Sequence, residues 1–384
     1  MWRHIASNFL TFLVVLVFLV GGVILWGQSE YTAQGPLDEP ICLRVERGSN
    51  MRAVSRELQG EGAISNGTIF RVGVDYANKN NLLKAGSWLI PEGASMAEIA
   101  DIITRGGASS CGTEVVYRIG VTDAEVEVRE LDPATNRYVE KAAFVPGEGA
   151  APEAFESVRE KGDTRYRIAV AEGVTSWQVL QGLAAVDVLE GEVNEIPPEG
   201  SLAPDSYEVR EGDTRASVIE RMRQAQDVIL AEAWEGRQED LPLQSPYEAL
   251  ILASIIEKET GVAEERGQVA SVFVNRLNLG MRLQTDPTVI YGITEGQGVL
   301  GRGLRRSELR ASTPWNTYVI DGLPPTPIAN PGRASIEAAV NPLSTEYIFF
   351  VADGTGGHAF ARTLDEHNRN VARWREIEAQ RATD

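Results

Sequence analysis

The 384-residue sequence has few side chains of the kinds that hold metals. It contains three histidines (His4, His358 and His367) and two cysteines (Cys42 and Cys111), and neither C-x-x-C nor H-E-x-x-H occurs in it. A dedicated zinc site needs more ligands than this composition offers. We therefore expect chemistry without a metal or another cofactor. Outside the cytoplasm the two cysteines could pair, and two buried free thiols are the alternative.

Positive charge is also scarce. The sequence has 36 Lys and Arg against 55 Asp and Glu, for a formal net charge of -19. A broad positive surface for phosphate backbones is therefore missing, which argues against nucleic acid as a partner. Two glycine patterns, GQGVLG and GTGGH, are predicted to be turns. The first follows no hydrophobic strand, and the second lacks the lysine of a phosphate-binding loop.

Charged residues are absent from Ile5 to Trp26. As a helix, this stretch would be roughly 30 Å long, the thickness of a bilayer's hydrocarbon core. We predict a transmembrane anchor in residues 1–28, because a cleaved signal would have a shorter apolar run followed by an A-x-A-like site. Arg3 precedes the run and Glu30 follows it, which predicts a cytoplasmic N-terminus and a large part outside.

The remainder is predicted to be of the α+β class. A polar tether, 29–40, leads to a β-α-α-β-α unit at 41–111. Residues 112–163 alternate at first and then become rich in Gly, Pro, Ala and Glu, which indicates a β-rich insertion and a flexible stretch. A second small unit, 164–240, precedes a mixed domain of helices and a hairpin at 241–384.

The two small units resemble each other in sequence. Ser87, Glu92 and Gly93 recur in the same spacing as Ser206, Glu211 and Gly212, and Gly48 has a counterpart in Gly173. We interpret these matches as two copies of one fold. Chance similarity between two strand-turn-helix segments is the alternative.

A nearly all-apolar helix is predicted after Ser245, which can cap it, and it ends with two glutamates, Glu257 and Glu259, before Gly261. Negative charge is unfavourable at a helix C-terminus, so a functional role is plausible on physical grounds. The two acids lie about 200° apart around the helix, so only one can face a given substrate bond. Glu257 follows small residues on its face, and we expect it to be the proton donor. Two solvated glutamates at a frayed helix end are the alternative.

Two later segments carry polar and aromatic groups suited to a sugar. A second helix is predicted at AEERGQVASVFVNRLNLG, and Gln284, Thr285 and Asp286 are predicted at a bend close to this helix pair. Trp315, Asn316 and Tyr318 are in a turn-rich segment. Aromatic faces beside amide groups suit a sugar cleft, where rings stack on C–H surfaces and amides bind hydroxyls. Trp315 and Tyr318 as simple core residues are the alternative. A hairpin turning at Asp353 to Gly357 and a helix capped by Thr363 and Glu366 should follow.

Three segments of the sequence resemble one known family. The sequence resembles the YceG-like endolytic murein transglycosylases of bacteria in ASIIEKETGVAEERGQVASVFVNRLNLGMRLQTDPTVIYG, STPWNTYVIDGLPPTPIANPG and YIFFVADGTGGHAF. The anchor and AGSWLIPEGASMAEI are similar to the front half of that family. The resemblance covers most of the chain, apart from residue 112 to about residue 162.

The resemblance implies a single-pass inner-membrane protein with its catalytic domain outside the cytoplasm. It implies cleavage of nascent peptidoglycan strands at MurNAc-GlcNAc bonds, with 1,6-anhydro-MurNAc ends, and LysM-like folds for the small units. It also implies Glu257, the first acid of E-K-E-T, as the catalytic acid. From their positions alone, Gln284, Asn316 and Tyr318 are our candidates for the polar neighbours of the developing positive charge. A hydrolytic muramidase using Asp286 and a non-enzymatic glycan-binding scaffold are the rival readings. Association with peptidoglycan synthases is left open.

Overall fold

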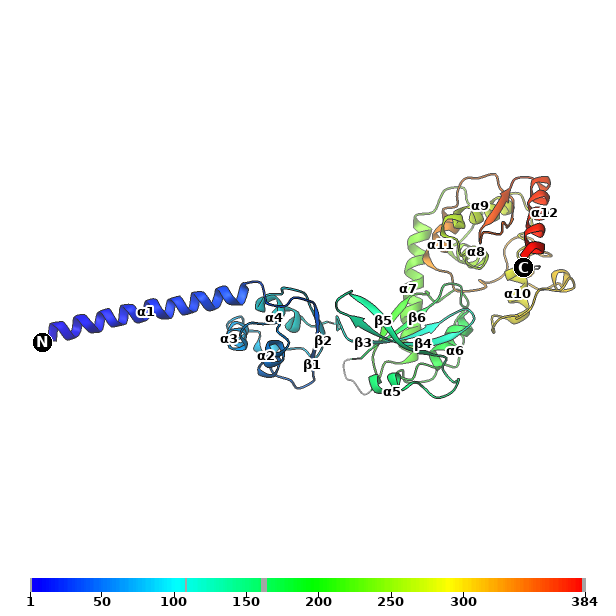
Figure 1. Ribbon diagram of the computed structural model, residues 1–384. Coiled ribbons are helices and arrows are strands. Elements are labelled where there is room, and N and C mark those ends of the chain that lie inside the picture. The colour runs from blue at the N-terminus through cyan, green and yellow to red at the C-terminus, as the bar shows by residue number, and fades with distance from the viewer. Residues whose placement is uncertain (1, 108, 160–163, 382–384) are drawn as a thin grey trace. The chain divides into compact units, whose positions relative to one another are not determined.

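The protein is described by a computed structural model that covers residues 2–107, 109–159 and 164–381 (Figure 1). The chain is of mixed α and β structure, as predicted, and divides into two compact units. The first comprises 1–115, 127–143 and 150–165, and the second 116–126, 144–149 and 166–384. Residue 1 of the predicted anchor, residue 108 of the first predicted small unit, residues 160–163 of the predicted insertion and residues 382–384 of the predicted catalytic domain lie outside the described residues.

The first unit begins with one long helix, α1 (Trp2–Thr32). Its large apolar side chains from Phe9 to Trp26 are 44% to 78% exposed, so within the described structure they have no core to join. The segment Asn8–Thr32 is long and apolar enough to cross a membrane. The structure thus contains the apolar helix that the sequence predicted.

Residues predicted as a tether are packed instead of free. The last turn of α1 reaches Thr32, Gly35 N–H donates to the Gly93 carbonyl at 3.0 Å, and Gly93 N–H donates to Leu37 at 2.9 Å. Leu37 is buried, with 7% of its surface exposed. Paired backbone groups and one buried leucine thus fix this segment on the first unit.

The small module that follows has the predicted order of elements. Its elements are β1 (Ile41–Val45), α2 (Met51–Gly60), α3 (Gly67–Tyr76), the 3-10 turn η1 (Asn80–Leu82), β2 (Gly86–Ile90) and α4 (Met96–Arg105). β1 pairs with β2 antiparallel, with Ile41 opposite Ile90 and Val45 opposite Gly86. Each α-helix has a side-chain cap, Asn50, Asn66 or Ser95, at its first turn. Such caps satisfy amide groups that the helix cannot pair internally.

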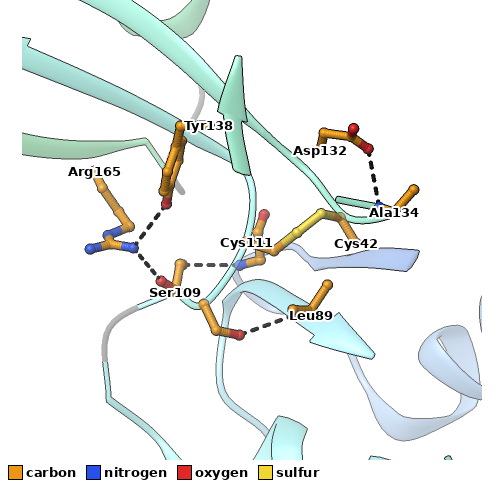
Figure 2. The surroundings of a disulfide bond; sticks show 10 residues. Cys42, Leu89, Ser109, Cys111, Asp132, Ala134, Tyr138 and Arg165 are labelled. Atoms are coloured by element: carbon orange, nitrogen blue, oxygen red, sulfur yellow. Dashed lines mark hydrogen bonds between the residues drawn. A yellow bond between two sulfur atoms is a disulfide. The ribbon is translucent and has the colours of Figure 1, made fainter. Parts of the chain in front are cut away.

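A disulfide joins the two cysteines (Figure 2). Cys42 lies on β1, Cys111 follows α4, and their Cα atoms are 5.8 Å apart. Cys111 N–H donates to the Ser87 carbonyl at 3.1 Å, so the cysteine segment runs beside β2. The pairing that the sequence left open is therefore decided in favour of the disulfide.

The strands β3 (Thr113–Ile119), β4 (Ala124–Asp132), β5 (Arg137–Phe144), β6 (Arg165–Val170) and β7 (Ser206–Val209) form a sheet in the order β5-β4-β3-β6-β7. The first three fit the β-rich interpretation of this region, whereas the helix α5 (Glu153–Arg159) was not expected in a stretch read as flexible. β6 and β7 pair antiparallel, with Tyr166 opposite Val209.

The second module repeats the first only in part. It contains β6, α6 (Ser176–Ala184), β7 and α7 (Arg215–Glu235), and the segment from 185 to 205, all of it described, has no counterpart of α3. The matched residues do occupy equivalent places. Ser87 and Ser206 lie on the second strand of each pair, and Ser95 and Thr214 cap the helix after it.

The rest of the second unit is built around α8 (Pro246–Glu259). Around it lie η2 (Ala263–Glu265), α9 (Arg266–Asn278), α10 (Asp286–Thr294), η3 (Glu308–Arg310), α11 (Arg333–Val340), the hairpin β8 (Phe349–Ala352) and β9 (His358–Ala361), and α12 (Leu364–Arg381). Ser245 caps α8, and every residue from Ala249 to Ile256 is buried. The helix packs against α7, α9, α10 and α11, which confirms its predicted central place.

No boundary between compact units falls at residue 240, where the sequence placed one. Asn330, fully buried, accepts a hydrogen bond from Leu202 N–H at 3.0 Å and donates to the Val174 carbonyl at 3.1 Å. Its backbone exchanges further bonds with Gly173 and Val174. Thr175 and Tyr291 add contacts of the same kind, to the Gly296 carbonyl and to Glu199. The second module is therefore part of the unit that holds α8.

Candidate active site

The two glutamates at the end of α8 have different surroundings. Both are partly exposed and lie two positions apart, so they point to different sides of the helix. The Glu257 carboxyl group contacts the start of a neighbouring helix. The Glu259 carboxyl group contacts Thr285, one of the residues predicted to bind substrate.

Glu257 binds the start of α11. Its Oε2 accepts a hydrogen bond from Gly332 N–H at 3.0 Å, and Gly332 is the N-cap residue of that helix. A second carboxyl group, that of Glu172, occupies the space that a side chain at Gly332 would need. Carboxylates are favourable at a helix N-terminus, where free amide groups and the helix dipole meet them. These contacts explain why the helix ends in an acid without invoking catalysis.

Glu172 belongs to the turn after β6 and was not singled out from the sequence. Burial raises its pKa, the charge of Glu257 raises it further, and Arg266 opposes both. Beside it, Lys258 Nζ donates to the Gly173 carbonyl at 3.2 Å. The turn after β6, in the second module, thus contacts the end of α8, although Gly173 and Lys258 are 85 residues apart in the sequence.

Glu259 faces the other predicted residues. Thr285 Oγ1 donates a hydrogen bond to its Oε1. Burial raises the pKa of Glu259, and the charge of Asp286 raises it further, against the Thr285 hydrogen bond and the charges of His358 and Arg276. A carboxyl group that keeps its proton towards neutral pH is suited to act as a general acid.

Asp286 and Tyr318 form a pair next to Glu259. Tyr318 donates its phenol proton to Asp286 Oδ1 at 2.7 Å. Burial and this hydrogen bond raise the pKa of Tyr318, so the phenol stays a donor. Asp286 is the first residue of α10 and Thr285 its N-cap residue, and the Asp286 carboxylate accepts the Tyr318 hydrogen bond.

Thr285 is held by a buried threonine cluster that the sequence did not indicate. Its N–H donates to Thr317 Oγ1 at 3.1 Å, and the Thr317 and Thr288 hydroxyls lie 2.8 Å apart. Thr285, Thr288 and Thr317 are each 3% exposed or less. The cluster fixes the backbone of residues 285 and 317, and so places the neighbouring Asp286 and Tyr318 side chains.

Three predicted residues take other places. Asn316 is fully buried, with its amide donating to the Glu308 and Ala311 carbonyls and accepting from Tyr318 N–H, so it holds its own loop and supports Tyr318. Trp315 donates to Thr326 Oγ1 at 2.9 Å and packs against the core around α8, as the core alternative proposed. Gln284 is exposed beside Thr285, in a left-handed conformation with φ of 49°.

Arg276 and His358 complete the surroundings of Glu259. Arg276, 7% exposed, donates to the Ile348 carbonyl at 2.7 Å and the Leu283 carbonyl at 2.6 Å, which holds its charge in place. Glu265 accepts from His358 N–H at 2.9 Å and lies 2.8 Å from its Nδ1. Both groups come from segments distant in the sequence, so only the fold brings them to the site.

A cavity of about 330 Å³ lies alongside. Lys258 of α8, Pro287 and Tyr291 of α10, and the glycine-rich segment 296–302 line it. Thr175 and Gln178 of the second module also line it, and Lys258 stands between Glu257 and Glu259 in the sequence. The pattern GQGVLG, predicted as a turn, is irregular and forms one wall.

Known proteins are similar to this chain in sequence over most of its length. The profile of the YceG-like family matches residues 43–373. An endolytic murein transglycosylase of Streptococcus pneumoniae serotype 2 is 28% identical over 380 residues, which are 96% of this chain and 65% of that protein. The Bacillus subtilis endolytic murein transglycosylase is 28% identical over 354 residues, which are 91% of this chain and 89% of that protein.

A solved structure is also similar. A YceG-like protein from Listeria monocytogenes is 27% identical, with a TM-score of 0.46 over 86% of this chain and 99% of the other. The chain spans about two thirds, 65%, of the length of the pneumococcal relative. Because the family profile covers most of the sequence, including the end of α8 and the segments with Asp286 and Tyr318, the chain belongs to the YceG-like family.

Proposed function

We propose that this protein is a membrane-anchored lytic transglycosylase that cuts peptidoglycan glycan strands internally. Family membership and two relatives named endolytic murein transglycosylase support the reaction class. The observation that carries the proposal is the cluster at the end of α8, where a carboxyl group of raised pKa meets Thr285 and the Asp286–Tyr318 pair.

We assign the proton donor to Glu259, in place of the Glu257 expected from the sequence. The Glu257 carboxyl group accepts a hydrogen bond from Gly332 N–H at the N-terminus of α11, away from the other predicted residues. Glu259 is in surroundings that favour the protonated form, beside the other predicted residues. An acid that must deliver a proton needs the second kind of environment.

The reaction needs only one such acid. Protonated Glu259 donates its proton to the glycosidic oxygen of a MurNAc-GlcNAc bond, and the bond from C1 to that oxygen breaks. The C6 hydroxyl of the same MurNAc attacks C1 and forms the 1,6-anhydro ring, while its proton passes to the Glu259 carboxylate. No water is consumed, and ring closure within one sugar benefits from high effective concentration. The Asp286 carboxylate would stabilise positive charge at C1.

The helix α1 is proposed to anchor the protein in the inner membrane, with its N-terminus in the cytoplasm and both units outside. Its exposed apolar surface and the Cys42–Cys111 disulfide support this placement, since disulfides persist outside the reducing cytoplasm. Glycan contact by LysM-like modules and association with peptidoglycan synthases stay predictions.

The test is mass spectrometry of glycan strands incubated with the full chain in detergent, beside Glu259→Gln and Glu257→Gln. We expect anhydro ends from the wild type and from Glu257→Gln, and intact strands with Glu259→Gln. Loss of cleavage with Glu257→Gln in a folded protein, and its survival with Glu259→Gln, would return the assignment to Glu257. Reducing ends, which are heavier by one water, would identify a hydrolase. No cleavage by the wild type would favour a glycan-binding scaffold.

A further inference from the structure

The first module exposes three large apolar side chains on one part of its surface. Tyr76 is 90% exposed, Val72 65% and Leu82 48%. Val72 and Tyr76 are four residues apart on α3, so they lie on one face of the helix, and Leu82 ends the short η1 turn that follows. Single exposed apolar residues are common. Whether these three form a contact surface therefore depends on where they lie in the module.

The face lies beside the end of the apolar helix α1. The Tyr31 ring of α1 fills the space next to Gly73, the residue between Val72 and Val74 on α3. Ser65, just before α3, donates to the Glu30 carboxylate at 2.6 Å. Figure 1 shows α3 on the side of the module from which α1 extends. The module is thus fixed to α1 through α3 and also through α4, and residues 33–37 between them are hydrogen-bonded to the module.

The distance from the apolar run to α3 is short. Trp26 is the last residue of the uncharged stretch, and Tyr31 lies five residues further along the same helix. A rise of 1.5 Å per residue makes this about 7.5 Å. The headgroup layer on each side of a bilayer is about 5–8 Å thick, because the total is about 40–45 Å and the hydrocarbon core about 30 Å. Tyr31 and the part of α3 packed on it therefore lie near the outer edge of the headgroup layer when α1 spans the membrane upright.

We propose that the face formed by Val72, Tyr76 and Leu82 lies in the headgroup layer of the bilayer that α1 spans, so that the first module is a membrane-surface element. The proposal rests on the anchoring role given to α1 above. Tyrosine is enriched at this depth because its ring is apolar and its hydroxyl polar. Amphipathic surfaces of this kind bury their apolar side chains about 5–10 Å into the boundary between headgroups and acyl chains.

The disulfide makes a direct test feasible. Because both native cysteines are bonded to each other, a single introduced cysteine can be labelled selectively. We would place a bimane label at Val72→Cys or Tyr76→Cys in the full chain, reconstituted in phospholipid nanodiscs. Quenching by iodide reports water, and quenching by brominated phospholipids reports lipid. Val228→Cys is the matched control, since Val228 is a helical valine of α7 with 54% exposure.

We expect labels at residues 72 and 76 to show several-fold weaker iodide quenching than the label at residue 228, together with quenching by brominated lipid. Equal iodide quenching at 72, 76 and 228 would refute the proposal. Protection from iodide without lipid quenching would also refute it, and would mean that protein covers the face. Phe18→Cys separates the premise from the proposal: a label there that lipid does not quench would show that α1 is not in the membrane at all.

Discussion

Replacement of Asn330 by alanine should destabilise the whole second unit. The buried Leu202 N–H loses its acceptor, and the Val174 carbonyl and Ser176 hydroxyl lose a donor. An unsatisfied buried donor costs about 1–3 kcal/mol, and each lost hydrogen bond a further 0.5–1.5 kcal/mol. We expect a loss of about 3 kcal/mol in the free energy of unfolding. For a unit of this size that lowers the midpoint of thermal unfolding by about 6–12 °C.

Calorimetry of the full chain in detergent measures the shift, and hydrogen exchange locates it. The amides of β6 and β7 and those of α8 should lose protection by similar amounts, because one buried side chain serves both parts. A change confined to β6 and β7, or a second unit that melts in two steps, would refute our description of one cooperative unit. Asn66→Ala, which removes the cap of α3, is the matched control. It should cost about 1 kcal/mol and affect only the first unit.

Three further outcomes follow from contacts described above. Asp286→Asn should lower the pKa of Glu259, because the Asp286 charge raises it. As the pH is raised, the variant should therefore lose cleavage activity at a lower pH than the wild type. The test is a pH–rate profile, with Asp227→Asn, at an exposed aspartate of α7, as the control. Replacing both Cys42 and Cys111 by alanine should cost the first unit about 4 kcal/mol in the chain-entropy view, because the bond closes a loop with a separation of 69 residues; thermal unfolding measures it. Gly73→Leu should displace the Tyr31 ring and free the end of α1, seen as faster proteolysis within residues 33–40. An unchanged pH–rate profile would contradict the first prediction, an unchanged unfolding midpoint the second, and an unchanged rate of proteolysis the third.

Signals that act over a few residues were read correctly from the sequence. Ser245 caps α8, and the hairpin turns from Asp353, whose N–H donates to the Gly357 carbonyl. Thr363 and Glu366 form the predicted capping pair at α12. Each of these depends on partners within four residues, which the sequence displays directly.

Features that depend on distant partners were not readable in this way. The different surroundings of Glu257 and Glu259 arise from Gly332, 75 residues on, and Thr285, 26 residues on. Periodicity places the two acids on different sides of α8 but cannot say what each side meets. The packing of residues 33–37 was not readable for a similar reason, because their partners, Gly93 and the core around Leu37, come from elsewhere in the module.

The capping of α11 by Glu257 has a consequence for how the E-K-E-T segment would change during evolution. Two acids separated by one residue would be retained under different pressures, the first for the integrity of the fold and the second for turnover. On the proposed assignment, a substitution at Glu257 could be compensated by any change that stabilises the start of α11, whereas no remote change could replace the proton that Glu259 donates. Invariance at both positions would therefore not show that both act on substrate.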